Sequence, residues 1–161
     1  MRSAMSSATA AATATPANLE QKLYGVLPWR RTKRGEIKVL LVAPRGGEHW
    51  SLPSGLPGND RTPRQTAMSE AFEKAGVVGH LDAGPIGSYS SQAAAPSPCV
   101  VEIYRLKVRG TLTNWPASTR CKRRWFRLDD AIQVVSNAGL KQLLASIGGN
   151  ETPFGADRKA A

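Results

Sequence analysis

The chain has 161 residues, and 41% of them are hydrophobic, which is enough to build one domain with its own core. It carries 22 Lys and Arg against 12 Asp and Glu, and the formal net charge of +10 indicates an anionic partner such as a small polyphosphate, nucleic acid or an acidic membrane surface. No apolar stretch is long enough to span a bilayer, so we expect no membrane-spanning helix. Cys99 and Cys121 lack the spacing of a metal site, so we expect reduced thiols in a cytoplasmic protein.

The chain begins with a polar segment and continues into two apolar ones. Residues 1–18 are rich in Ala, Ser and Thr, and we expect a disordered tail there, a folded domain over 19–149 and a flexible tail over 150–161. The apolar residues of 23–29 and 36–42 predict two strands.

A cluster of cations lies between these two predicted strands. Its members are Arg30, Arg31, Lys33 and Arg34. A solvated hairpin turn is the ordinary explanation for such a cluster, and attraction of a polyanion is the other.

A loop interrupted by proline and glycine leads into a short helix. Its breaking residues are Pro53, Gly55, Pro57 and Gly58. Thr62 with Gln65 forms the pattern of a capping box, and Pro63 suits the first helical position. Gly76 then predicts the end of the helix.

The predicted helix has two different faces. Helical periodicity gathers apolar residues on one side: Ala67, Met68, Ala71, Phe72 and Ala75. The other side carries Thr66, Ser69, Glu70, Glu73 and Lys74. Two carboxylates three residues apart, next to the backbone of Gly55, suit a magnesium ion that holds a phosphate chain. The alternative is a solvated face on which Glu70 and Lys74 form a surface pair.

Strands are also predicted after the helix, at 77–81, 86–89 and 99–108, with a loop at 92–98. Alternation along 99–108 places Glu102 on the same side as apolar residues. A carboxylate there needs a cation or hydrogen-bond donors, so Glu102 either completes a metal site or pairs with an arginine.

The last part of the chain combines a basic run with aromatic residues. The run is Arg120, Lys122, Arg123 and Arg124, followed by Trp125 and Phe126. It either binds nucleic acid through phosphate contacts and stacking or places the two aromatics in the core. Asp129 is a candidate cap for a final helix, with Gly139 as a candidate break.

The segment from Gly55 to Val77 resembles a Nudix box. The pattern of that box is Gly, five residues, Glu, seven residues, Arg-Glu, an aliphatic, any residue, Glu-Glu, any residue, Gly and an aliphatic. Five residues match it at the correct spacing: Gly55, Glu70, Glu73, Gly76 and Val77. Three charged positions differ, with Arg61 at the first Glu, Ser69 at the Arg and Lys74 at the last Glu.

Residues outside the box are similar to the diphosphoinositol polyphosphate phosphohydrolase branch of the Nudix superfamily. They are Trp50-Ser51-Leu52-Pro53, Asn114-Trp115 and the stretch 122–132, and the resemblance covers about 24–147. It implies an α/β fold in which a mixed sheet is sandwiched between the box helix and the terminal helix.

The resemblance also implies an activity, which is attack of water on a phosphoanhydride with the help of Mg²⁺ or Mn²⁺. The implied substrate is an inositol pyrophosphate or a dinucleoside polyphosphate. Glu70 and Glu73 would bind the metal and act in catalysis, and Glu102 is a candidate further ligand. The candidate contacts to substrate phosphates are Gly55, Arg30 and Arg31. Lys74, which departs from the family pattern, is a further candidate because its charge could contact a phosphate directly.

The departures from the box predict weak hydrolysis. Lys74 places a positive charge where the metal is attracted, and the hydroxyl of Ser69 cannot make the bidentate bonds of an arginine. The alternative function is a Nudix-fold module that binds a polyphosphate or nucleotide ligand without turnover. RNA binding is a third hypothesis and is less favoured.

Overall fold

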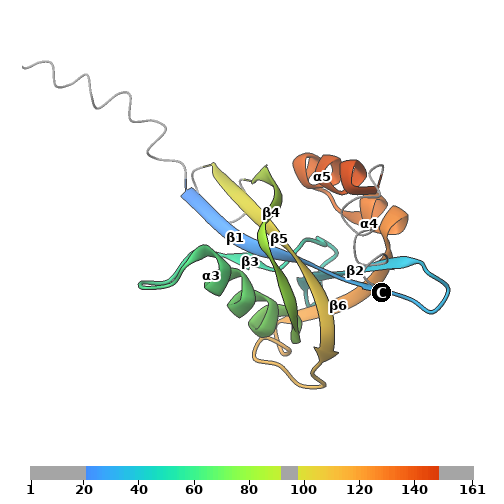
Figure 1. Cartoon of the computed structure of the whole chain (residues 1–161), viewed down its shortest axis with the longest axis horizontal. Coiled ribbons are helices and arrows are strands. Elements are labelled where there is room, and N and C mark those ends of the chain that lie inside the picture. The colour runs from blue at the N-terminus through green and yellow to red at the C-terminus, as the bar shows by residue number, and fades with distance from the viewer. Residues whose placement is uncertain (1–20, 92–97, 149–161) are drawn as a thin grey trace, which may run out of the picture.

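A computed structural model of the chain describes residues 21–91 and 98–148 (Figure 1). The tails predicted at 1–18 and 150–161, and nearly all of the loop predicted at 92–98, lie outside the described residues. The strands are β1 (Gln21–Arg31), β2 (Ile37–Pro44), β3 (Ser54–Gly55), β4 (Val77–Ser91), β5 (Cys99–Thr111) and β6 (Cys121–Arg127). The helical segments are α3 (Pro63–Glu70), the π-helical η1 (Ala71–Ala75), α4 (Leu128–Val134) and α5 (Ala138–Gly148).

The strands form one mixed sheet in the order β4-β5-β1-β2-β6, and the short β3 pairs with β1 outside this path. The pairing of β1 with β5 is parallel, and the other pairs are antiparallel. The strands predicted at 77–81 and 86–89 are one strand, β4, in which the register to β5 shifts between Leu81 and Pro85 and again before Gly87. Pro85 cannot donate to the ladder, and such irregularities let the strand continue past it.

Helices cover both faces of the sheet, as the α/β sandwich prediction requires. In Figure 1, α3 lies on one side of the strands and α4 with α5 lies on the other. Side chains of strand β2 alternate between the two faces of the sheet and so contribute to both cores. Val39 and Leu41 belong to the core under α4 and α5, whereas Leu40 and Val42 belong to the core under α3 and η1. The mixed α/β/α architecture predicted from the sequence is therefore confirmed.

The box helix begins and ends where the sequence predicts. The amide of Gln65 donates to Thr62 Oγ1 at 3.1 Å, and the amide of Thr62 donates to Gln65 Oε1 at 2.9 Å, which completes the capping box. At the other end Gly76 adopts a left-handed conformation with φ of +63°.

The middle of the box helix differs from the prediction because it changes from α to π geometry at Ala71. Ala67, Ala71 and Ala75 are buried, but Phe72, predicted on the apolar face, is 39% exposed. Phe72 directly follows Ala71 in the turn, so it lies at the edge of the face that Ala67, Ala71 and Ala75 bury. Thr66, predicted on the polar face, is buried next to Ala67.

The C-terminal helices are also divided differently from the prediction. Arg127 occupies the N-cap of α4, and Asp129, the predicted cap, lies in the first turn instead. The helix break falls before Asn137, whose Oδ1 accepts a hydrogen bond from the amide of Leu140 at 2.9 Å. Gly139, the predicted break, lies inside α5, because the side chain of Asn137 caps this helix.

The thiols of Cys99 and Cys121 are free, as predicted, and Cys99 Sγ donates to the Ser91 carbonyl at 3.0 Å. Within the described part of the chain, no helix has both the length and the apolar character needed to cross a bilayer.

Candidate functional site

The glycine of the box lies directly against the first box carboxylate. Strand β3 pairs with β1 in the register Tyr24↔Gly55, which fixes the loop beside the box helix. A Cβ atom on Gly55 would lie 2.4 to 2.9 Å from the carboxylate atoms of Glu70. Only a residue without a side chain permits this approach. The structure therefore brings Gly55 and Glu70 together, as the sequence predicted.

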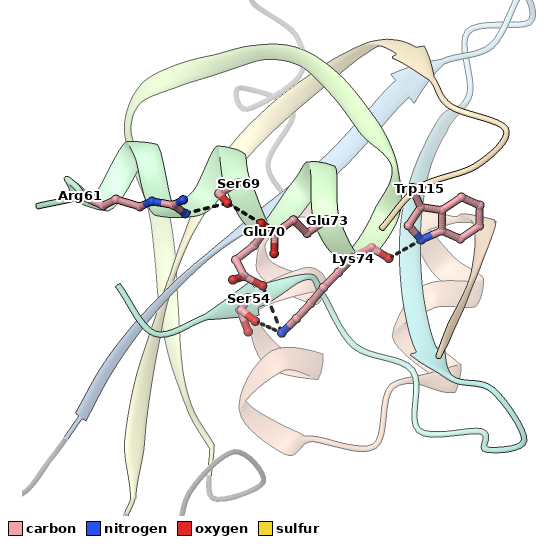
Figure 2. A network of polar contacts seen from close by, with 7 residues as sticks. All are labelled: Ser54, Arg61, Ser69, Glu70, Glu73, Lys74 and Trp115. Carbon is pink, nitrogen blue, oxygen red and sulfur yellow. Dashed lines mark hydrogen bonds and ion pairs between the residues drawn. The ribbon is translucent and has the colours of Figure 1, made fainter. Parts of the chain in front are cut away.

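Lys74 occupies the space between this carboxylate and the loop. Its Nζ lies 3.1 Å from Glu70 Oε1 and donates a hydrogen bond of 2.5 Å to the carbonyl oxygen of Ser54 (Figure 2). The Glu70 side chain is only 15% exposed, and among the described residues no hydrogen bond of good geometry reaches its Oε1. The charge of Lys74 is therefore what offsets the burial of the carboxylate.

The second box carboxylate is held by a different pair of residues. The guanidinium of Arg61 donates to Ser69 Oγ at 2.8 Å, and Ser69 Oγ donates in turn to Glu73 Oε2 at 3.4 Å (Figure 2). We predicted that Ser69 leaves the acids without an orienting arginine. The structure corrects this in part, because Arg61 supplies a guanidinium from the preceding loop.

Residues far along the chain fix the backbone of η1. Trp115 Nε1 donates to the Lys74 carbonyl at 3.1 Å, and the amide of Ala117 donates to the Glu73 carbonyl at 3.0 Å. Arg123 Nη1 donates to the Ala75 carbonyl at 2.7 Å and so caps the end of the helix with a cation. Burial lowers the pKa of Arg123.

The roles of these distant residues were not predicted from the sequence. Trp115 was noted only through family resemblance, and Arg123 belongs to the basic run for which nucleic-acid binding and a core position of the adjacent aromatics were both considered. Alternation along β6 is the signal that was available, since it separates Arg123 and Trp125 on one face from the buried Phe126 on the other. The acceptors of these side chains are backbone carbonyls, which every residue type carries, so the contacts leave no mark in the sequence.

A cavity of about 660 Å³ opens beside Gly55 and Lys74. It extends to the junction of α4 and α5, where Asn137 and Leu140 contribute to its wall. Most of its lining is apolar, and among the described residues those that line it with a permanent positive charge are Lys74 and Arg120. The cavity therefore presents a cation at the box and an apolar wall beyond it.

The third predicted metal ligand is not brought to the box. Glu102 lies on β5 and faces the α3 side of the sheet, but Tyr24 stands between it and Gly55 in the row Gly55, Tyr24, Glu102. Among residues 21–91 and 98–148, no three His, Cys, Asp or Glu side chains gather in a way that could hold a metal ion. Burial, and to a lesser extent the charge of Glu102, raises the pKa of the neighbouring Tyr104.

The predicted phosphate contacts Arg30 and Arg31 do not reach the cavity either. Successive residues of a strand point to opposite faces, so these two arginines are separated by the sheet. The Arg30 guanidinium lies 4.1 Å from the centroid of the Trp125 ring, and Arg31 lies over Trp29 at 6.0 Å. Of the predicted phosphate contacts, Gly55 and Lys74 line the cavity.

Sequence comparison relates the chain to Nudix hydrolases. Nudix hydrolase 21, chloroplastic, from Arabidopsis thaliana is 29% identical over 128 residues, which are 77% of this chain and 64% of that protein. Diphosphoinositol polyphosphate phosphohydrolase 3-alpha from Homo sapiens is 31% identical over 107 residues, which are 65% of this chain and 63% of that protein. The chain thus spans just under two thirds of the length of these curated relatives. No protein-family model matches it.

Solved structures show which fold the chain shares. The Ap4A hydrolase of C. elegans has a TM-score of 0.65 at 22% identity and covers 81% of this chain and 98% of its own. The NUDIX domain of Shewanella oneidensis NrtR, complexed with ADP ribose, has a TM-score of 0.63 at 18% identity and covers 91% of this chain and 100% of its own. The chain has the fold of Nudix proteins, and its sequence is similar to those of Nudix hydrolases.

Nudix hydrolases generally need divalent metal ions, and the residues of this Nudix box do not fit one. Magnesium is bound by oxygen ligands at near-octahedral geometry. Here the Glu70 carboxylate and the Ser54 carbonyl both face the ammonium of Lys74. Two unit charges about 4 Å apart interact by about 4 kcal/mol at an effective dielectric constant of about 20, and a divalent ion doubles this repulsion. Solvent around the partly exposed lysine reduces the magnitude but not the sign.

Proposed function

We propose that this chain is a Nudix-fold protein that binds a phosphoanhydride ligand in the cavity beside Gly55 and Lys74 and hydrolyses it slowly. The single observation that carries the proposal is the position of the Lys74 ammonium between Glu70 Oε1 and the Ser54 carbonyl. The loop and helix that make up a Nudix box are in place, so a diphosphate can be received there. The charge that activates water in related enzymes is weakened by the same lysine.

The lining of the cavity favours a nucleotide over an inositol pyrophosphate. An inositol pyrophosphate carries phosphates around its whole ring and needs cations on all sides. The cavity wall is mostly apolar, with Trp50 and Tyr89 among its members and Lys74 and Arg120 as its Lys and Arg residues. Such a wall suits an uncharged group attached to a charged phosphate chain. We therefore favour dinucleoside polyphosphates and other diphosphate-linked nucleosides as the ligand class.

The comparisons support the same class. One similar structure is of an Ap4A hydrolase and another is of a domain complexed with ADP ribose. Hydrolysis of inositol pyrophosphates remains the prediction from the curated relatives. A cytoplasmic location also remains a prediction, since one relative is described as chloroplastic and another as mitochondrial.

Calorimetric titration with Ap4A, ADP-ribose, an inositol pyrophosphate and a short RNA tests the proposal, together with an assay of released phosphate. We expect Ap4A or ADP-ribose to bind more tightly than the other two and phosphate release with Mg²⁺ or Mn²⁺ to be slow. Any residual release should disappear in Glu70→Gln and in Glu73→Gln. Rapid turnover that survives both substitutions would refute the proposed roles. Preference for RNA with a steep salt dependence would favour nucleic-acid binding instead.

A further inference from the structure

We infer that the ammonium of Lys74 is a built-in counter-ion that replaces the divalent cation of a Nudix box, so that the site binds phosphoanhydrides without metal. The inference deepens the proposed function and rests on it, because it concerns how the same site neutralises its ligand. Its basis is that the Lys74 ammonium contacts both the Glu70 carboxylate and the carbonyl of Ser54, the residue before Gly55.

The first argument is the set of contacts around the ammonium. A lysine ammonium has three N–H donors, and contacts to Glu70 and Ser54 account for two directions. The Lys74 side chain is still 40% exposed and contributes to the cavity wall. Figure 2 shows the side chain running from η1 toward the loop, with its nitrogen between the two acceptors. A phosphate oxygen in the cavity can therefore accept a hydrogen bond from the third N–H of the Lys74 ammonium.

The second argument is the charge of the site. Glu70 and Lys74 neutralise each other, so the box contributes one further negative charge, that of the exposed Glu73. The pattern of a complete box would place three carboxylates on the helix, at positions 70, 73 and 74, and a fourth at position 61, which repel a phosphate unless a divalent cation lies between. With Lys74 in place, that cation is not needed for a phosphate to approach. The same substitution that opposes metal binding therefore favours direct anion binding.

The third argument is that Lys74 is held before any ligand arrives. Trp115 fixes its carbonyl and Arg123 fixes the end of η1, as described above. The Trp115 ring also packs under the Arg123 guanidinium, whose carbon lies 3.9 Å from the ring centroid. A fixed backbone reduces the conformational freedom that the lysine loses when it contacts phosphate.

The experiment compares binding of ADP-ribose and Ap4A in excess EDTA and in Mg²⁺, by calorimetry, for the whole chain and its variants. For the unaltered chain we expect the better probe to bind in EDTA with a Kd within about threefold of the Kd in Mg²⁺. Lys74→Met should weaken binding about 10- to 100-fold in both conditions, which is the range of one charge-assisted hydrogen bond. Lys33→Met, which removes the same charge from the β1–β2 turn, should bind like the unaltered chain.

Lys74→Glu gives a result that misfolding cannot imitate. It restores the box residue, so binding of the probe should be lost in EDTA and recovered in Mg²⁺. Binding of Mg²⁺ alone should become detectable by calorimetry in this variant and stay undetectable in the unaltered chain.

The outcomes separate the inference from the proposed function. If the unaltered chain binds a probe only with Mg²⁺, or if Lys74→Met binds as tightly as the unaltered chain, the inference is wrong and the proposed function stands. If neither probe binds in either condition while a thermal melt shows a folded protein, the proposed function fails and the inference fails with it.

Discussion

Arg61 and Ser69 stand where the box pattern has Glu and Arg, and a hydrogen bond of 2.8 Å joins them. The box pattern has its guanidinium on the helix, whereas in this chain the guanidinium belongs to Arg61 in the loop before the helix. The hydroxyl of Ser69 links this guanidinium to the carboxylate of Glu73. An isolated loss of the helix arginine would leave this carboxylate without its donor. At the scale of single residues, the two changes therefore compensate each other.

This compensation predicts a coupling between positions 61 and 69. Ser69→Arg alone places a second guanidinium against that of Arg61, so it should lower the free energy of unfolding. Arg61→Glu together with Ser69→Arg places opposite charges at these two neighbouring positions, and an exposed ion pair is worth about 0.2–1 kcal/mol. Urea unfolding of the four proteins in a double-mutant cycle measures the coupling.

The sign of the coupling and its salt dependence decide the interpretation. We expect the double variant to be more stable than the sum of the single changes, and the excess to shrink in 1 M salt, where the Debye length is about 3 Å. Strict additivity at low salt would show that positions 61 and 69 do not interact in the folded protein.

At the scale of secondary-structure elements, three cations share one row of the sheet. The register places Arg30 opposite Lys38 and Lys38 opposite Arg127, so all three side chains lie on the same face of β1, β2 and β6. Arg127 is partly balanced by Glu36, at 3.7 Å, in a pair that is largely exposed. Like charges directly opposite each other destabilise a sheet.

Reversal of the central charge should therefore stabilise the protein. Lys38→Glu turns the row into alternating charges and should raise the free energy of unfolding by about 0.5–1 kcal/mol at low salt. Lys33→Glu is the matched control, because it makes the same change in net charge from the turn between β1 and β2. Equal gains in both variants, measured by urea unfolding, would assign the effect to net charge rather than to the row.

The elements that could be predicted are those determined by local chemistry. Thr62 and Gln65 determine the start of the box helix, and Gly76 determines its end, because capping depends on residues close in sequence. The π turn at Ala71 and the pairing of β3 with β1 could not be predicted, because both depend on packing against distant strands.

The candidate site was predicted to the same extent. Spacing placed Gly55, Glu70 and Lys74 together, since the box is a local motif. The Ser54 carbonyl, Trp115 and Arg123 were missed as parts of the site, because a backbone acceptor has no residue type and the other two are far away in the chain. Glu102 was a candidate metal ligand because strand alternation placed it on a given face of the sheet. Alternation does not give the distance from that residue to the box helix.

At the scale of the whole molecule, Tyr89 connects the ligand cavity to the main core. It is 8% exposed, belongs to the core under α4 and α5, and lines the cavity. Burial, with a smaller contribution from the nearby Cys99, raises the pKa of Tyr89 to about 12. In the unfolded chain a tyrosine titrates near pH 10.

This difference predicts how stability falls at high pH. Below about pH 10 both states keep the proton, so the contribution of Tyr89 is fully present. Between about pH 10 and 12 the unfolded state loses its proton first, so the free energy of unfolding should fall by about 1–3 kcal/mol. Tyr89→Phe has no proton to lose, so its stability should decline less over the same interval, as urea unfolding at several pH values would show. The difference in the free energy of unfolding between the unaltered protein and Tyr89→Phe should be constant below about pH 9, because Tyr89 keeps its proton there in both the folded and the unfolded state. Parallel curves up to pH 12 would mean that the Tyr89 hydroxyl reaches water in the folded protein.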